Sequence, residues 1–257
     1  MNYRPHFSTA DGLSPHSNSA LSDRIERYWS RRADSYGATR RAELSSDKKS
    51  QWLDEILPYL PGKELLRILD IGTGTGFFAI LMAQHGHLAC GIDMSEAMLE
   101  EGRLIARQQG CDVSFRKMDA GCLEFENESI DVVLSRNLTW TLQDAANAYK
   151  EWYRVLRPGG VLLNFDADYG SVSFIDVVHY PGKHAHVGMD ADMMEECERI
   201  RQKLPLSRES RPDWDMRALR AVGFSRCQCD EALSSRVYTR QDESYNPVPM
   251  FAINAVK

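Results

Sequence analysis

A glycine-rich segment near residue 70 constrains the fold of this chain more than any other feature. It reads Asp70-Ile71-Gly72-Thr73-Gly74-Thr75-Gly76 and lies between the apolar run Leu65–Asp70 and an apolar stretch with helical spacing at residues 77–83. Glycines in a turn allow positive φ angles and a close approach of the backbone to a ligand. A strand, a glycine turn and a helix in this order predict a ligand site at the amino-terminal end of the helix.

Strand-like and helical segments alternate along the next hundred residues. Strand signals lie at residues 88–93, 113–118, 130–135 and 161–165, and helical patterns lie at residues 97–109 and 145–156. This alternation favours an α/β fold with a parallel sheet covered on both faces. Two later strand signals, at residues 224–229 and 248–256, are separated by a long excursion, which favours an antiparallel pair.

The remaining segments predict parts that flank this sheet. Residues 1–20 are polar and broken by prolines, so we expect a mobile tail. Residues 21–60 carry two amphipathic patterns, one that Ser22 can cap and that continues to Tyr36, and one near Trp52 that stops at Pro58. Residues 61–257 would form the main domain, in which residues 169–212 are an insert, irregular to residue 191 and then helical.

Composition limits the classes of function. Lys and Arg number 31 and Asp and Glu number 37, so the net charge is −6. Such a chain is a poor candidate for non-specific nucleic-acid binding, although a local basic patch remains open. No apolar stretch has the length of a membrane span, and the first residues lack the apolar run of an export signal. We therefore expect a cytoplasmic protein whose six cysteines are free thiols, with no membrane partner.

An acid at the end of the second strand adds to the ligand signal. Asp93 lies 21 residues after Gly72, where a carboxylate accepts hydrogen bonds from ribose hydroxyls. The glycine spacing is G-x-G-x-G rather than the dinucleotide pattern G-x-G-x-x-G, and Asp70 precedes it. An acid at this place disfavours a pyrophosphate and suits an ammonium group, which argues against a nicotinamide dehydrogenase.

Five ordered motifs resemble those of the class I S-adenosylmethionine-dependent methyltransferases. They are residues 69–76, 91–95, 118–120, 131–135 and 156–160. The resemblance covers roughly residues 60–168 and implies a Rossmann-like, doubly wound sheet of seven strands in the order 3-2-1-4-5-7-6, with strand 7 antiparallel. It also implies an N-terminal helical lid and S-adenosyl-L-methionine as cofactor, with S-adenosyl-L-homocysteine as product.

The resemblance also implies roles for individual cofactor-binding residues. Asp70 and Gly72 would hold the methionyl part, Gly74 and Gly76 would shape the turn, and Asp93 would bind the ribose. At the adenine, the implied residues are Met94, Asp119 and the amide of Ala120. Near the reacting methyl they are Arg136 or Asn137, and in the lid they are Tyr28 and Tyr36. Other interpretations stay open: Asp119 could cap a turn, Met94 could be core, and the two tyrosines could simply pack in the helical stripe.

Candidate catalytic residues follow the fifth strand. Methyl transfer from a sulfonium needs a lone pair on the acceptor, so a general base helps only a protonated acceptor. His179, His184 and His186 could supply that base, or they could be solvated loop residues. Their spacing matches no metal motif, so we predict no metal. Asp166 or Asp168 could bind a substrate amine or cap a turn.

The leading functional hypothesis is a methyltransferase acting on nitrogen or oxygen of a small molecule. The chain is short and acidic, and the Pro-Pro-Tyr type of motif used by base- and amide-methylating relatives is replaced by Ser135-Arg136-Asn137-Leu138. Alternatives are a methyltransferase of tRNA, rRNA or protein, and a regulator that binds the cofactor without turnover. A pocket arginine among Arg211, Arg236 and Arg240 would favour a carboxylate-bearing substrate. A monomer and a homodimer are both compatible with the sequence.

Overall fold

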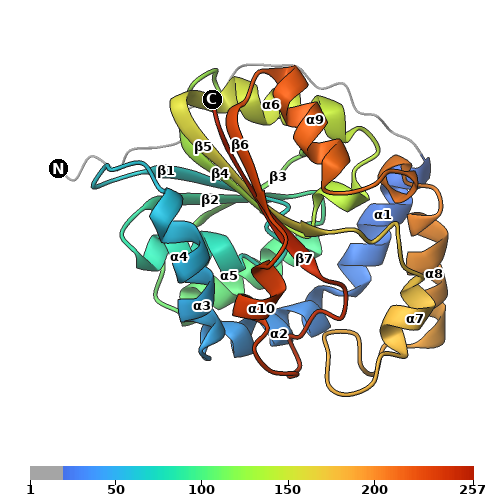
Figure 1. Ribbon diagram of the computed structural model, residues 1–257. Coiled ribbons are helices and arrows are strands. Elements are labelled where there is room, and N and C mark those ends of the chain that lie inside the picture. Colours follow the sequence, from blue (N-terminus) through green and yellow to red (C-terminus); the bar gives the residue numbers. More distant parts are fainter. Residues whose placement is uncertain (1–19) are drawn as a thin grey trace.

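The computed structural model describes residues 20–257, and the expected mobile tail lies, except for its last residue, outside the described residues. A seven-stranded sheet runs through the molecule (Figure 1). Its strands are β1 (Arg67–Ile71), β2 (Leu88–Asp93), β3 (Ser114–Lys117), β4 (Ile130–Arg136), β5 (Leu156–Ala167), β6 (Ser225–Asp230) and β7 (Met250–Val256). Their order is β3-β2-β1-β4-β5-β7-β6, with β7 antiparallel to β5 and β6. The predicted fold class, strand order and antiparallel seventh strand are confirmed.

Helices cover both faces of this sheet. On one face lie α3 (Lys48–Ile56), α4 (Phe77–Gln84) and α5 (Glu96–Gln108), and on the other lie α6 (Ala145–Val155) and α9 (Asp213–Val222) (Figure 1). All residues of β4 are buried, as expected for a central strand between two helical layers. Shorter helices are η1 (Leu57–Tyr59), η2 (Thr139–Thr141) and α10 (Leu233–Val237).

The N-terminal helical segment is broken, which corrects the expectation of one continuous helix. It consists of α1 (Ala20–Arg31) and α2 (Ala33–Leu44). Helix α1 packs on α5 and on α8 (Ala191–Arg201), whereas α2 packs on α3 and α5. The apolar spacing continues across Arg32, so periodicity alone could not show this break. Because α1 already begins at Ala20, Ser22 does not cap it, and the Ser22 hydroxyl instead accepts a hydrogen bond from Gln143 at 2.6 Å.

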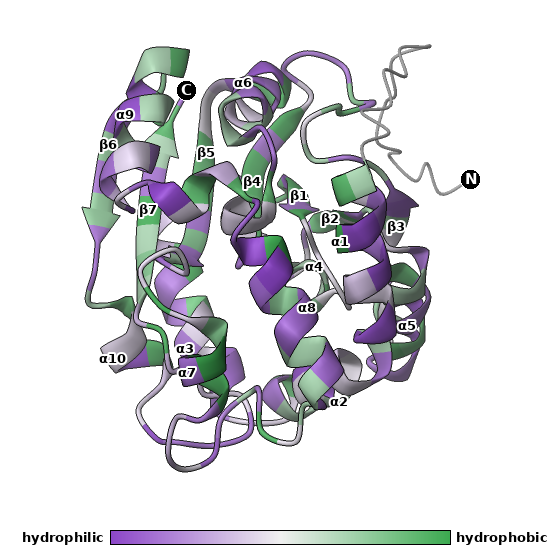
Figure 2. Cartoon of the chain, turned by 90° about the vertical axis from the view of Figure 1, so that its right-hand side faces the viewer, coloured by the Kyte–Doolittle hydropathy of each residue, from purple (hydrophilic) through white to green (hydrophobic). Residues whose placement is uncertain are grey.

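The segment after β5 is more regular than its sequence suggests. It holds α7 (Phe174–Val178), α8 (Ala191–Arg201) and η3 (Pro205–Arg208). Only the second of these was expected, because α7 has five residues and too short a pattern to recognise. Helix α8 lies beside α1 (Figure 2), and Arg24 donates to Glu196 at 2.6 Å between them.

None of the helices between Ala20 and Lys257 combines the length and the hydrophobicity that a bilayer span requires.

Candidate active site

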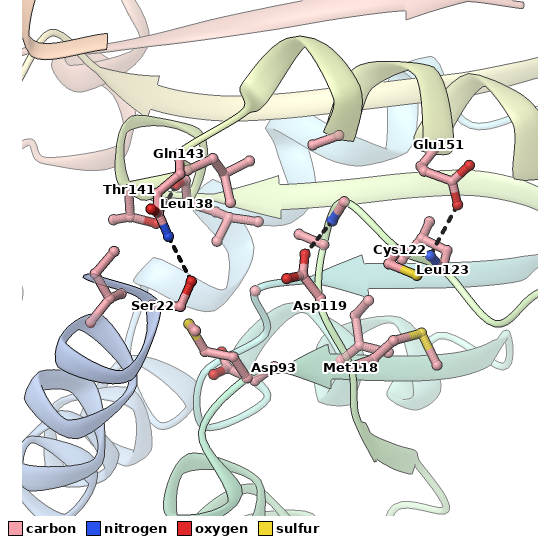
Figure 3. Close-up of a pocket in the computed structure, with 18 of the residues that line it drawn as sticks. Ser22, Asp93, Met118, Asp119, Cys122, Leu123, Leu138, Thr141, Gln143 and Glu151 are labelled. Carbon is pink, nitrogen blue, oxygen red and sulfur yellow. Dashed lines mark hydrogen bonds between the residues drawn. The ribbon is translucent and has the colours of Figure 1, made fainter. Parts of the chain in front are cut away.

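A cavity of about 800 Å³ opens at the carboxyl ends of the parallel strands. Its lining includes the glycine turn after β1, the end of β2, the loop after β3 and the end of β4, together with α1 and α2. In an open α/β sheet, this edge is where ligands bind. Figure 3 shows Asp93, Met118 and Asp119 at these strand ends, and Ser22 joined to Gln143.

The glycine turn after β1 forms one wall of the cavity. Gly72 and Gly74 have φ angles of +66° and +53°, where side chains are strained. A methyl group on Gly72 would lie 2.6 Å from the Leu138 side chain, and one on Gly74 would lie 3.1 Å from the Tyr36 ring. The turn therefore has no room for side chains, and the ring of Tyr36 from α2 rests directly on it.

Asp93 lines the cavity with its carboxylate already oriented. One carboxylate oxygen accepts a hydrogen bond from the Gly74 amide at 2.9 Å, and the other accepts one from the Ser95 amide at 2.9 Å. Burial raises the pKa of Asp93 to about 6, although these amides oppose the rise. The carboxylate is thus held at the end of β2 and ionises just below neutral pH.

Asp70 lies beneath the glycine turn rather than in the cavity lining. Its carboxylate accepts hydrogen bonds from the Thr73 hydroxyl at 2.5 Å and from the Ala79 amide at 3.1 Å. Burial raises its pKa to about 7. These contacts join the turn to the start of α4, so here Asp70 shapes the site from below. Gly76, with φ of +86°, begins α4 and also lies outside the lining.

The far end of the cavity combines thioether side chains with a polar turn. Met94, Met98 and Met118 line it, as do Asp119 and Ala120. Asp119 accepts a hydrogen bond from the Gly121 amide at 2.7 Å (Figure 3). Asp119 therefore caps a turn, as one interpretation of the sequence expected. Because Asp119 also lines the cavity, its contact with the adenine stays a prediction.

Asn137 is the most constrained residue at the end of β4. Its φ angle is +55°, its amide donates to the Phe165 carbonyl at 2.8 Å, and its carbonyl accepts from the Trp140 indole at 3.1 Å. The side-chain oxygen of Asn137 accepts from the Tyr169 hydroxyl at 3.1 Å, and that hydroxyl accepts from Asn246 at 2.8 Å. These bonds orient Asn137, which lines the cavity. Sequence reasoning found Asn137 but missed Tyr169 and Asn246, because no motif links positions so far apart.

Helix α1 closes the cavity by polar contacts on several sides. Besides the Ser22–Gln143 bond, the hydroxyls of Ser30 and Ser95 are 2.8 Å apart. Lys117 Nζ donates to Glu26 at 2.6 Å. Of the two tyrosines predicted in the lid, Tyr36 lines the cavity, whereas Tyr28 is 3% exposed and packs in the core.

No histidine is found among the described residues that line the cavity. His179 is exposed, and His184 is buried with its Nδ1 facing the His186 amide at 3.2 Å. Burial lowers the pKa of His186 to about 3, and the positive charge of Arg32 adds to this effect. A histidine with so low a pKa is a weak base at neutral pH.

Asp166, near the end of β5, also lies away from the cavity and is fully buried. It pairs with Arg211 at 3.0 Å and accepts a hydrogen bond from the Trp140 amide at 3.1 Å. Arg211 additionally binds both oxygens of Asp215 at 2.8 and 2.9 Å. Arg211 is therefore part of a closed structural network and is no pocket arginine. Arg236 pairs with Glu55 at the surface, and Arg240 is mostly exposed.

Within residues 20–257, no group of three or more histidine, cysteine or acidic side chains has a geometry that could hold a metal ion.

Known proteins resemble this chain mainly in its central part. Residues 68–160 match the methyltransferase domain family. Over 110 residues the chain is 36% identical to ubiquinone biosynthesis O-methyltransferase of Pseudomonas entomophila, a match covering 42% of this chain and 46% of that protein. Over 135 residues it is 33% identical to arsenite methyltransferase of Halobacterium salinarum, covering 51% and 32%. The matches thus span less than half the length of these relatives.

A solved structure extends the likeness over more of the fold. Phosphoethanolamine N-methyltransferase 2 of Haemonchus contortus, in complex with S-adenosyl-L-methionine, matches with a TM-score of 0.63 and 19% identity, covering 95% of this chain and 61% of that chain. At this identity the likeness shows the fold alone.

The strand order and the antiparallel β7 define the Rossmann-like class I methyltransferase fold. Residues 68–160 therefore carry a methyltransferase domain, within a chain that has the fold of the class I S-adenosylmethionine-dependent methyltransferases.

Proposed function

We propose that this protein transfers a methyl group from S-adenosyl-L-methionine to a nitrogen or oxygen atom of a small molecule and releases S-adenosyl-L-homocysteine. The observation that carries the proposal is the cavity itself, because the glycine turn, Asp93, Asp119 and Asn137 all line it. The name of one relative, an O-methyltransferase, supports an oxygen acceptor, and the fold of an N-methyltransferase resembles that of this chain.

The proposed cofactor contacts follow from these positions. Gly72 and Gly74 would lie under the methionyl part, and Asp93 would accept hydrogen bonds from the ribose hydroxyls. Met94 and Met118 would lie against the adenine, with Asp119 and the Ala120 amide at its edge. Asp70 and Gly76 would act from outside the cavity, by setting the shape of the turn.

The proposed reaction depends on orientation more than on a general base. The cofactor supplies a methyl group on a positively charged sulfur, and an acceptor lone pair takes it in line with the breaking carbon–sulfur bond. Asn137 and Tyr36 would hold the reacting groups in position, and α1 would exclude water. Because no histidine lies among the described lining residues, we propose an acceptor whose lone pair is already free at neutral pH.

The proposed partner is therefore a small molecule in the cytoplasm, and not a nucleic acid. The way the cavity is closed supports this choice, since α1 is bonded to the loop before α6 and to the start of α5. A large acceptor would need that helix to move away.

Methyl-labelled cofactor, incubated with the protein and a cell extract that is then separated by size, tests the proposal. We expect label in the low-mass fraction with the wild-type protein and with the surface control Asp54→Asn, and strongly reduced label with Asp93→Asn. Label in RNA or protein would replace the small-molecule acceptor by a macromolecule. Cofactor binding without label in any fraction would favour a regulator.

A further inference from the structure

Three buried arginines lie near the cavity. Two of them share a single carboxylate, and the third, Arg32, lies close enough to His186 to lower the pKa of that histidine, as Arg40 also does. Arg32, Arg40 and Arg136 are 9%, 4% and 8% exposed. Arg136 donates to both oxygens of Glu43 at 3.0 and 2.9 Å, and Arg40 also pairs with Glu43. Among residues 20–257 no carboxylate lies within 4 Å of the Arg32 guanidinium. The four side chains therefore carry a net charge of +2, and burying uncompensated charge is costly.

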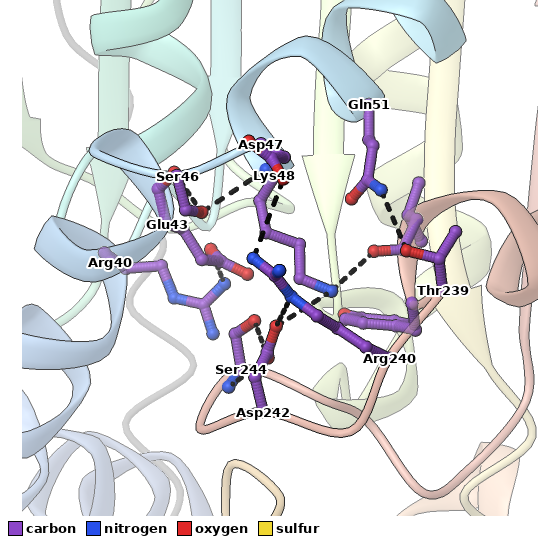
Figure 4. A network of polar contacts seen from close by, with 12 residues as sticks. Arg40, Glu43, Ser46, Asp47, Lys48, Gln51, Thr239, Arg240, Asp242 and Ser244 are labelled. Atoms are coloured by element: carbon purple, nitrogen blue, oxygen red, sulfur yellow. Dashed lines mark hydrogen bonds and ion pairs between the residues drawn. The ribbon is translucent and has the colours of Figure 1, made fainter.

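The neighbouring charges do not supply the missing negative charge. Lys48, which is also buried, lies 3.5 Å from Asp242 and donates to the Val237 carbonyl at 2.7 Å. The same Asp242 lies 3.6 Å from Arg240. Figure 4 shows Lys48 between Glu43 and the loop that carries Asp242. Asp242 is therefore already shared by two cations.

Several nitrogen atoms of this region also lack hydrogen-bond partners within the described part of the chain. They are Nε of Arg40, Nε of Arg136 and Nδ1 of His186, all of them buried. The low pKa of His186 keeps its ring neutral, so it adds no charge to the group. Buried donors without acceptors are rare in folded proteins, and a bound group often explains them.

Two of the three arginines adjoin the end of the cavity where methyl transfer is proposed. Arg136 lines the cavity and directly precedes Asn137. The Arg40 guanidinium lies 4.6 Å from the centre of the Tyr36 ring, and Tyr36 lines the cavity and rests on Gly74. A group bound by these arginines would thus be next to the reacting atoms.

Aromatic rings offer a partial alternative explanation. The Arg136 guanidinium lies 4.4 Å from the centre of the Trp52 ring, and cation–π contacts of this kind stabilise a buried cation. They do not neutralise it, and they leave the Nε donors of Arg40 and Arg136 unpaired. A negatively charged oxygen group would both neutralise these cations and accept hydrogen bonds from the unpaired donors. The guanidinium fork matches carboxylates and phosphates in this way.

We propose that Arg32, Arg40 and Arg136 bind a carboxylate or phosphate group of the methyl acceptor, so that this enzyme acts on a small anionic substrate. This inference rests on the proposed function. The same anionic chemistry could come from the carboxylate of the cofactor, and the experiment below separates the two sources.

Binding of inorganic phosphate and of acetate to the complex with S-adenosyl-L-homocysteine, followed by calorimetry, tests the inference. We expect at least one of these anions to bind the wild-type complex, and the better binder to indicate the type of group. Arg40→Gln should weaken that binding at least about tenfold, while the affinity for S-adenosyl-L-homocysteine changes less than about twofold. Arg40→Lys should retain part of the anion binding, because it keeps the charge.

Arg31→Gln is the matched control, since Arg31 is exposed on α1 and the same charge is removed. An equal loss of anion binding in this variant would reduce the effect to general electrostatics and overturn the inference. A tenfold loss of S-adenosyl-L-homocysteine affinity in Arg40→Gln would assign the arginines to the cofactor carboxylate and also overturn it. Failure of the wild-type protein to bind S-adenosyl-L-homocysteine would instead remove the proposed function. Cofactor binding without any anion binding would remove this inference alone.

Discussion

Replacing Asp93 by Asn tests the ribose assignment with little change of shape. An ionised carboxylate that accepts hydrogen bonds from ribose hydroxyls contributes about 1.5–3 kcal/mol, so S-adenosyl-L-homocysteine should bind about 10- to 150-fold more weakly to Asp93→Asn. Both carboxylate oxygens already accept backbone amides, from Gly74 and Ser95. The new NH₂ group would face one of these donors, which adds to the loss.

The pH dependence gives the same test a second readout. Burial raises the pKa of Asp93 to about 6 in the free protein, whereas ribose hydroxyls favour the ionised form. Binding therefore lowers this pKa and strengthens as pH rises through 6. About a tenth of the carboxylate stays ionised at about pH 5, so wild-type affinity should fall about tenfold between about pH 7.5 and about pH 5.

Calorimetry with S-adenosyl-L-homocysteine over this pH range measures both effects. Asp70, whose pKa burial raises to about 7, titrates in the same range and is present in both proteins, so the difference between the two pH profiles isolates Asp93. Asp54→Asn, an exposed site on α3, should behave as wild type. An Asp93→Asn affinity within about twofold of wild type, or identical pH profiles, would refute the assignment.

Three further changes have expected outcomes. Tyr169→Phe removes the hydroxyl that orients Asn137 and should slow methyl transfer about three- to tenfold without unfolding the protein; an unchanged rate would exclude the orienting role. Arg211→Met removes the cation that pairs with the buried carboxylates of Asp166 and Asp215. It should lower the free energy of unfolding by about 3–5 kcal/mol, which corresponds to a decrease of roughly 10 °C in the melting temperature; an unchanged melting temperature would contradict this. Gly76→Ala places a methyl group 2.6 Å from the Phe115 ring at a positive φ and should lower the free energy of unfolding in urea by about 1–3 kcal/mol; an unchanged free energy of unfolding would contradict both the strain and the contact.

Most of the fold could be predicted because its signals are local. The turn after β1 and the acid at the end of β2 are each recognised from a few neighbouring residues, and the glycines of the turn restrict the backbone directly. The apolar runs of β1, β2 and β4 mark buried parallel strands for the same reason.

The parts that could not be predicted depend on contacts between distant segments. Asn137 is oriented by Tyr169 and Asn246, and Glu43 pairs with Arg136 across 93 positions of the chain. Neither arrangement leaves a pattern in the sequence. Asp166 illustrates the same limit, because its position at the edge of the sheet suggested a ligand contact, whereas its partner Arg211 keeps it buried.

A crystal structure of the complex with S-adenosyl-L-homocysteine tests the central claim most directly. We expect the ligand in the cavity at the carboxyl ends of β1, β2 and β4, with its ribose hydroxyls within hydrogen-bond distance of Asp93 and its sulfur at the Asn137 end. A ligand bound elsewhere, or a ribose away from Asp93, would show that this cavity is not the cofactor site or that Asp93 does not bind the ribose.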